Sequence, residues 1–92
     1  MRVAWTLDAL EDRRAIYEHV ESDNPPAAIR LDELLRDQAG RLSSHPRIGR
    51  PGRIAGTREL VAHQNYVIVY DITPDCVRVL RVLHAARMWP PV

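Results

Sequence analysis

Cysteine, phenylalanine and lysine are scarce or missing in this chain of 92 residues. Its single cysteine, Cys76, can neither close an internal disulfide nor supply the second thiol of a zinc knuckle, so it has the character of a small apolar strand residue. Phenylalanine is absent, and aromatic residues make up only 5% of the sequence. These absences argue against a disulfide scaffold, a zinc module and an aromatic platform for stacking bases.

Long apolar runs are absent as well. No stretch of about 18 residues is continuously apolar, and Asp8 interrupts the N-terminal segment before a signal-like region develops. We therefore expect a protein without a membrane span that works in the reducing cytoplasm. With 46% apolar residues, a chain of 92 residues can bury one core, which predicts a single domain over residues 1–92.

Positive charge comes from arginine alone and is unevenly distributed. Residues 1–46 hold six Arg against nine acidic residues, a net charge of −3, whereas residues 47–92 hold seven Arg against three acids, a net charge of +4. Codon bias explains a lack of lysine, but it does not explain the acid-poor second half. The sequence shows no Gly-rich phosphate loop ending in lysine, no metal-ligand cluster and no Ser/His/Asp signature, so we expect neither a metal nor a cofactor.

Two helices are predicted in the first half. Thr6 is an N-cap candidate for a helix from about Leu7 to Ser22, and Asn24 is the cap of a second helix that starts at Pro25 and runs to about Leu42. Asp12 falls on the polar face of the first helix. The apolar stripe that we expect this helix to bury consists of Leu7, Leu10, Ile16, Tyr17 and Val20. A tight turn joins the helices, which predicts an antiparallel hairpin.

Four segments have strand character: Arg2–Trp5, Thr57–Val61, Tyr66–Ile72 and Cys76–His84. Turn residues separate the last three, which predicts a three-stranded antiparallel meander. The final segment is apolar at nearly every position, as expected for an interior strand. We predict an α+β fold of order β-α-α-β-β-β, in which an N-terminal strand and a helical hairpin pack on a small antiparallel sheet.

A basic run, His45–Arg53, precedes the meander and reads as a loop because it contains glycine and proline. Arg47, Arg50 and Arg53 follow one another at a spacing of three. A charge run of this kind is often only a solvated face, and the alternative is contact with phosphate or with an acidic partner. The three arginines are therefore candidates for binding a target or partner.

Three segments, in this order and spacing, resemble the RelE/ParE family of bacterial toxins from toxin-antitoxin modules: Gly56–Leu60, Asn65–Tyr70 and Leu80–Arg87. The resemblance covers nearly all of the chain. It implies a toxin of a type II toxin-antitoxin system, held by a cognate antitoxin in a hetero-oligomer. It also implies that the antitoxin is a small DNA-binding protein with a disordered tail that folds on the toxin.

The family contains two kinds of toxin. Some members cut messenger RNA on the ribosome without a metal, and the ParE-like members inhibit DNA gyrase and are not nucleases. A nuclease of this kind needs an acid, a base and arginines that stabilise the charge of the phosphorane. The resemblance makes His84, Arg58, Arg81 and Arg87 the catalytic candidates, with Arg53 as a further cation.

Val67 favours the ParE-like branch, because many ribosome-dependent nucleases carry an arginine at this position and valine cannot bind phosphate. His84 supports the nuclease alternative, since some nucleases of the family rely mainly on a C-terminal histidine. Two of the catalytic candidates, His84 and Arg58, also have a structural interpretation. His84 can end a strand with its ring bonded to a backbone group, and Arg58 can form an ion pair with Glu59 across the sheet.

Tyr66, Tyr70 and Trp89 complete the candidates for binding a target or antitoxin. Tyr66 and Tyr70 fall on one face of a strand, where a basic RNA-binding module without toxicity would stack bases, although a chain without Phe and Lys supports such a module poorly. Trp89 is a tail anchor or a contact residue. We predict a toxin that arrests bacterial growth by ParE-like inhibition of DNA gyrase, with RelE-like cleavage of ribosome-bound messenger RNA as the alternative.

Overall fold

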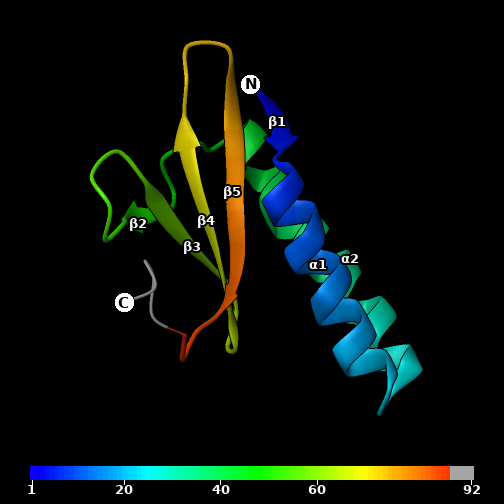
Figure 1. Ribbon diagram of the computed structural model, residues 1–92. Coiled ribbons are helices and arrows are strands. Elements are labelled where there is room, and N and C mark those ends of the chain that lie inside the picture. Colours follow the sequence, from blue (N-terminus) through cyan, green and yellow to red (C-terminus); the bar gives the residue numbers. More distant parts are fainter. Residues whose placement is uncertain (88–92) are drawn as a thin grey trace.

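The computed structural model describes residues 1–87, and the candidate Trp89 lies outside the described residues. The elements, in chain order, are β1 (Arg2–Trp5), α1 (Leu7–Glu21), α2 (Pro25–Gly40), the 3₁₀ helix η1 (Arg41–Ser43), β2 (Arg50–Pro51), β3 (Arg58–His63), β4 (Tyr66–Ile72) and β5 (Cys76–His84). Figure 1 shows α1 and α2 side by side along one side of a five-stranded sheet. The predicted α+β fold is confirmed.

The sheet has the strand order β1-β5-β4-β3-β2. Strands β3, β4 and β5 form the predicted antiparallel meander, and β5 is interior because β1 pairs with its other edge in parallel. Strand β2 was not predicted. It pairs Arg50 with Glu59 and Pro51 with Arg58, and its two residues lie inside the run that glycine and proline mark as a loop. Proline is tolerated there because β2 is an edge strand.

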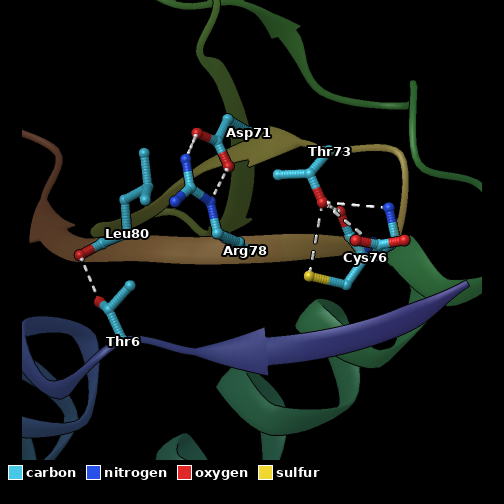
Figure 2. A network of polar contacts seen from close by, with 7 residues as sticks. Thr6, Asp71, Thr73, Cys76, Arg78 and Leu80 are labelled. Carbon is cyan, nitrogen blue, oxygen red and sulfur yellow. Dashed lines mark hydrogen bonds and ion pairs between the residues drawn. The ribbon is translucent and has the colours of Figure 1, made fainter.

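Both predicted helix caps are confirmed. The Thr6 Oγ1 accepts a hydrogen bond from the Ala9 N–H at 3.1 Å, and the Asn24 Oδ1 accepts one from the Ala27 N–H at 3.2 Å. The Thr6 hydroxyl also donates to the Leu80 carbonyl at 3.0 Å, which ties the start of α1 to β5 (Figure 2). Within residues 1–87, no helix is long and apolar enough to cross a membrane.

The hydrophobic core lies between the helical hairpin and the sheet. Helix α1 meets it on only part of the predicted face. Ile16 packs against the core, but Leu7 is 84% and Leu10 is 45% exposed, whereas Ala9 is completely buried. Asp12, one turn beyond Ala9, points toward the sheet, although the sequence placed it on the polar face. The prediction of a buried Leu7 and Leu10 is therefore wrong, because the sheet offers Asp12 a charged partner.

Polar contacts fix the β4–β5 hairpin (Figure 2). The Thr73 hydroxyl accepts a hydrogen bond from the Cys76 N–H and donates to the Cys76 carbonyl, each at 3.0 Å. Arg78 donates to both oxygens of Asp71, its partner across the two strands, at 2.9 and 2.5 Å. These contacts hold the register of the strands that carry the candidate site.

Candidate functional site

The sheet face opposite the helices holds a pocket of about 200 Å³. Its floor is apolar, because Val61, Val67, Val69 and Leu83 alternate along their strands with residues of the helix-facing core. The residues that surround this floor are Arg50, Arg53, Glu59, His84, Ala85 and Arg87. Val61 is 53% exposed, whereas Val69 and Leu83 are 1% and 4% exposed, so the floor is open to solvent mainly at Val61. The pocket is thus an apolar surface with cationic side chains at its edge.

Glu59 organises one edge of this pocket. Its side chain is only 6% exposed, and a buried carboxylate is stable only when it is paired. Oε1 accepts a hydrogen bond from the Arg50 guanidinium, and Oε2 accepts one from the backbone N–H of Arg53, both at 3.2 Å. Glu59 pairs with Arg50 and not, as the sequence had suggested, with Arg58, because neighbouring side chains of a strand point to opposite faces.

Arg58 and Tyr70 lie on the other face of the sheet and hold the loop of residues 46–49. The Arg58 Nη1 donates to the Gly49 carbonyl at 2.7 Å and to the Arg47 carbonyl at 3.3 Å. The Tyr70 hydroxyl accepts from the Gly49 N–H at 2.9 Å and donates to the Pro46 carbonyl at 2.7 Å. Tyr70 is completely buried, so its predicted role as a contact residue does not fit its position.

Arg81 connects α1 to β5. Its Nε donates to the Asp12 Oδ2 at 2.7 Å and its Nη2 to Oδ1 at 3.1 Å, while the Val82 N–H donates to the same Oδ2 at 2.9 Å. The hydrogen bonds that Arg81 donates to Asp12 raise the pKa of Arg81 above its usual value, so the guanidinium stays charged. Arg81 is committed to this contact and does not line the pocket.

His84 ends β5 at the edge of the pocket. Its Nδ1 accepts a hydrogen bond from the Ala86 N–H at 3.1 Å, and its ring stands edge-on to Tyr66 with 5.5 Å between the ring centroids. In the neutral ring, the proton then sits on Nε2, so the nitrogen left for a ligand is a donor. Tyr66 is 9% exposed and packs into the core beside this ring.

The pocket unites two of the four catalytic candidates. His84 and Arg87 line it, whereas Arg58 and Arg81 are bound elsewhere. It also unites two of the three loop arginines. Arg50 and Arg53 line the pocket and Arg47 does not.

Sequence reasoning missed Glu59 as a member of the site. The sequence did contain a signal for this role: Glu59 is one of only three acidic residues in the half of the chain that carries seven arginines. An acid placed among so many cations in a strand is a natural partner for one of them. Only the fold shows that this partner is Arg50, nine residues earlier.

Comparison with known proteins decides the family. The sequence model described as "ParE toxin of type II toxin-antitoxin system, parDE" matches residues 3–89. The chain belongs to this ParE toxin family. Among its relatives, Y4kP of Sinorhizobium fredii is 44% identical over 92 residues, which cover 99% of this chain and 95% of that protein. Toxin RelE2 of Caulobacter vibrioides is 38% identical over 87 residues, covering 95% of this chain and 98% of that protein.

Solved structures extend the comparison of this ParE-family chain. A chain in the toxin-antitoxin complex RelBE2 of Mycobacterium tuberculosis is 30% identical, with a TM-score of 0.68 over 90% of this chain and 95% of that one. A chain of the chromosomal ParDE system of P. aeruginosa shares the fold, with a TM-score of 0.83 at 24% identity over 91% of this chain and 95% of that one. The protein is a toxin of a type II toxin-antitoxin system in the ParE/RelE superfamily.

Proposed function

We propose that this toxin arrests growth by binding and inhibiting DNA gyrase, and that it does not cut messenger RNA. The proposal is supported by the hydrogen bonding of the side chains in the pocket that could transfer a proton. Among the described residues that line the pocket, these groups are Glu59 and His84, and the acceptor atoms of both are engaged in hydrogen bonds within the protein.

Cleavage of RNA requires a base that takes the proton of the ribose 2′-hydroxyl. Glu59 is buried, and each of its oxygens already accepts a hydrogen bond. His84 uses Nδ1 as an acceptor, so its other nitrogen offers a proton in the neutral ring and not a lone pair. His84 would have to give up a contact before it could act as the base, and the burial of Glu59 and its pairing with Arg50 keep its carboxylate from reaching a ribose hydroxyl.

The pocket floor supports a protein target. Val67 pairs with Val61 on one side and with Leu83 on the other, so apolar side chains continue across three strands. Val61 exposes this surface to solvent, and an apolar patch that is exposed and edged by charged residues is typical of a protein–protein interface. Arginine at the edge suits acidic side chains of a partner, because its planar fork binds carboxylates through two hydrogen bonds. The assignment to gyrase comes from the ParE-like branch that Val67 favours.

A cognate antitoxin is part of the proposal. The similar structures from M. tuberculosis and P. aeruginosa are toxin-antitoxin systems, which supports a partner of this kind here. The helical hairpin has apolar surface left to cover, since Leu7 is 84%, Leu10 45% and Ile29 49% exposed. An antitoxin tail that folds on the toxin would bury such surface, and acidic residues in it would complement the arginine-rich second half.

Cleavage of ribosome-bound messenger RNA is the second candidate. It is favoured by the joint presence of His84, Arg53 and Arg87 at the pocket and by the relative named Toxin RelE2. In this alternative, RNA binding would break the bond between His84 and the Ala86 N–H to free a lone pair. The alternative therefore requires a rearrangement of the β5 terminus.

Induction in bacteria without the antitoxin separates the candidates. We expect plasmid supercoiling to fall and the DNA-damage response to rise before translation is affected, because gyrase inhibition acts on DNA first. Messenger RNA recovered from ribosomes at the same time should carry no new cleavage sites. New cleavage sites that precede any change in supercoiling would contradict the proposal.

A further inference from the structure

The loop that presents Arg50 and Arg53 is held by a fully buried tyrosine. Tyr70 is 0% exposed and belongs to the hydrophobic core, yet its hydroxyl bridges two backbone groups of the loop. It accepts from the Gly49 N–H at 2.9 Å and donates to the Pro46 carbonyl at 2.7 Å. A buried hydroxyl is stable only when it is hydrogen-bonded, so the loop and the tyrosine satisfy each other.

The contact leaves no space for a side chain at position 49. A Cβ atom on Gly49 would lie 2.6 Å from the Tyr70 hydroxyl oxygen, closer than side chains tolerate, and 3.0 Å from the Glu59 carbonyl oxygen, which is a tight contact. The loop backbone is therefore seated directly on Tyr70. A residue other than glycine would push the loop away from the sheet.

Two neighbouring residues of β3 fasten the same loop from opposite faces of the sheet. Arg58 donates to the Gly49 carbonyl at 2.7 Å on the helix side. Glu59 binds the Arg50 guanidinium and the Arg53 N–H on the pocket side. The backbone just before Arg50 is thus fixed by Arg58 and Tyr70, and the arginines after it are directed to the pocket edge.

We infer that Tyr70 and Arg58 are positioning residues, which fix the loop of residues 46–53 so that Arg50 and Arg53 stand at the pocket edge before a target binds. Neither side chain lines the pocket, so both act through the two arginines. A loop ordered in advance binds more tightly, because less conformational entropy is lost on association. The inference rests on the proposed function in one respect, namely that the pocket is the surface that binds the target.

The test is Tyr70→Phe, which removes only the hydroxyl. Growth arrest after induction is the readout, because it reports toxin action whatever the target is. Losing the bridge should raise the amount of toxin needed for half-maximal arrest about fivefold or more, the fold-change that corresponds to one hydrogen bond. Tyr17→Phe removes the same atom from a partly buried tyrosine of α1 and should change this amount less than about twofold.

A double-mutant cycle distinguishes positioning from a general loss of stability. In a background that carries Arg50→Gln and Arg53→Gln, Tyr70→Phe should cause almost no further loss, because the side chains through which it acts are gone. An equal loss in both backgrounds would mean that Tyr70 is merely structural and would overturn the inference. If Tyr70→Phe does not fold, Arg58→Gln takes its place in the cycle, because Arg58 is only half-buried and contacts the same loop.

Hydrogen exchange supplies a readout that is independent of toxicity. The Gly49 amide should lose protection in Tyr70→Phe, while the amides of β4 and β5 keep theirs. Full toxicity despite an unprotected Gly49 amide would overturn the positioning role. If the wild-type toxin arrests growth without inhibiting gyrase, the proposed target fails, and the cycle measured by growth arrest still decides the inference.

Discussion

Replacing Asp12 by alanine is expected to destabilise the fold by roughly 2–3 kcal/mol. The Asp12 carboxylate accepts two hydrogen bonds from Arg81 and one from the Val82 N–H, and it joins α1 to β5. Breaking a fully buried ion pair costs about 3–5 kcal/mol, because the remaining charge is left without a partner. The Asp12 and Arg81 side chains are 14% and 21% exposed, so water compensates part of this loss.

Thermal unfolding followed by circular dichroism measures the effect. A domain of this size loses about 4–8 °C in Tm for each kcal/mol, so Asp12→Ala should unfold about 10–20 °C below the wild type. Glu18→Ala is the matched control, because its ion pair with Arg14 is exposed and screened by water, so its loss should leave Tm nearly unchanged. If the two variants unfold at the same temperature, Asp12 does not hold α1 to the sheet and the reasoning is wrong.

A double substitution tests why Asp12→Ala lowers the stability of the fold. Changing Asp12 and Arg81 together to leucine removes both charges, and well-packed apolar residues often replace a buried ion pair with little loss. The double variant should therefore be more stable than Asp12→Ala alone. A further decrease in Tm would show that Arg81 contributes through contacts other than the ion pair.

Two further predictions concern the loop and the antitoxin. Gly49→Ala should destabilise the protein by about 1–3 kcal/mol in urea unfolding, because its Cβ would clash with Tyr70. Gly40→Ala, at the end of α2 with no atom within 4 Å of the new Cβ, should be neutral or stabilising by up to about 1 kcal/mol, and the opposite ranking would refute the clash. Affinity for the cognate antitoxin should fall as salt rises, measured by calorimetry between low and high ionic strength, whereas an affinity independent of salt would exclude an acidic tail on the arginine-rich half.

The strands and helix caps could be predicted because their signals are local. Strands β4 and β5 have the bounds predicted from the sequence, Tyr66–Ile72 and Cys76–His84, since turn residues end each apolar run. Thr6 and Asn24 cap their helices through their own side chains, a contact three residues long. Such features need no knowledge of the rest of the molecule.

The buried residues in the first turns of α1 could not be predicted, because the decisive contact there is not local. Asp12 reaches Arg81 across 69 residues, and nothing near Asp12 in the sequence marks it as an inward-facing acid. Leu7 and Leu10, more apolar than Ala9, point outward instead. The helical period showed that the helix is amphipathic, and the sheet determined which of its faces is buried.

The sequence indicated arginines and a histidine as candidate site residues, but it could not show which of them lie together. In the fold, some of the candidate arginines line the pocket and others hold the structure. Arg53 and Arg87 line the pocket, whereas Arg58 and Arg81 are occupied by a loop carbonyl and by Asp12. The residues around these arginines in the sequence contain no signal that separates an arginine that binds a partner from one that stabilises the fold.

The most direct test of the central claim is inhibition of purified gyrase by purified toxin. We predict that wild-type toxin stops the supercoiling of relaxed plasmid and leaves ribosome-bound messenger RNA intact. His84→Gln should inhibit supercoiling within about twofold of the wild type, because no catalytic step depends on this residue, whereas a true general base would cost about 10²–10⁴ in rate when removed. Cleavage of ribosome-bound message that is lost in His84→Gln, with supercoiling unaffected by the wild-type toxin, would contradict the account.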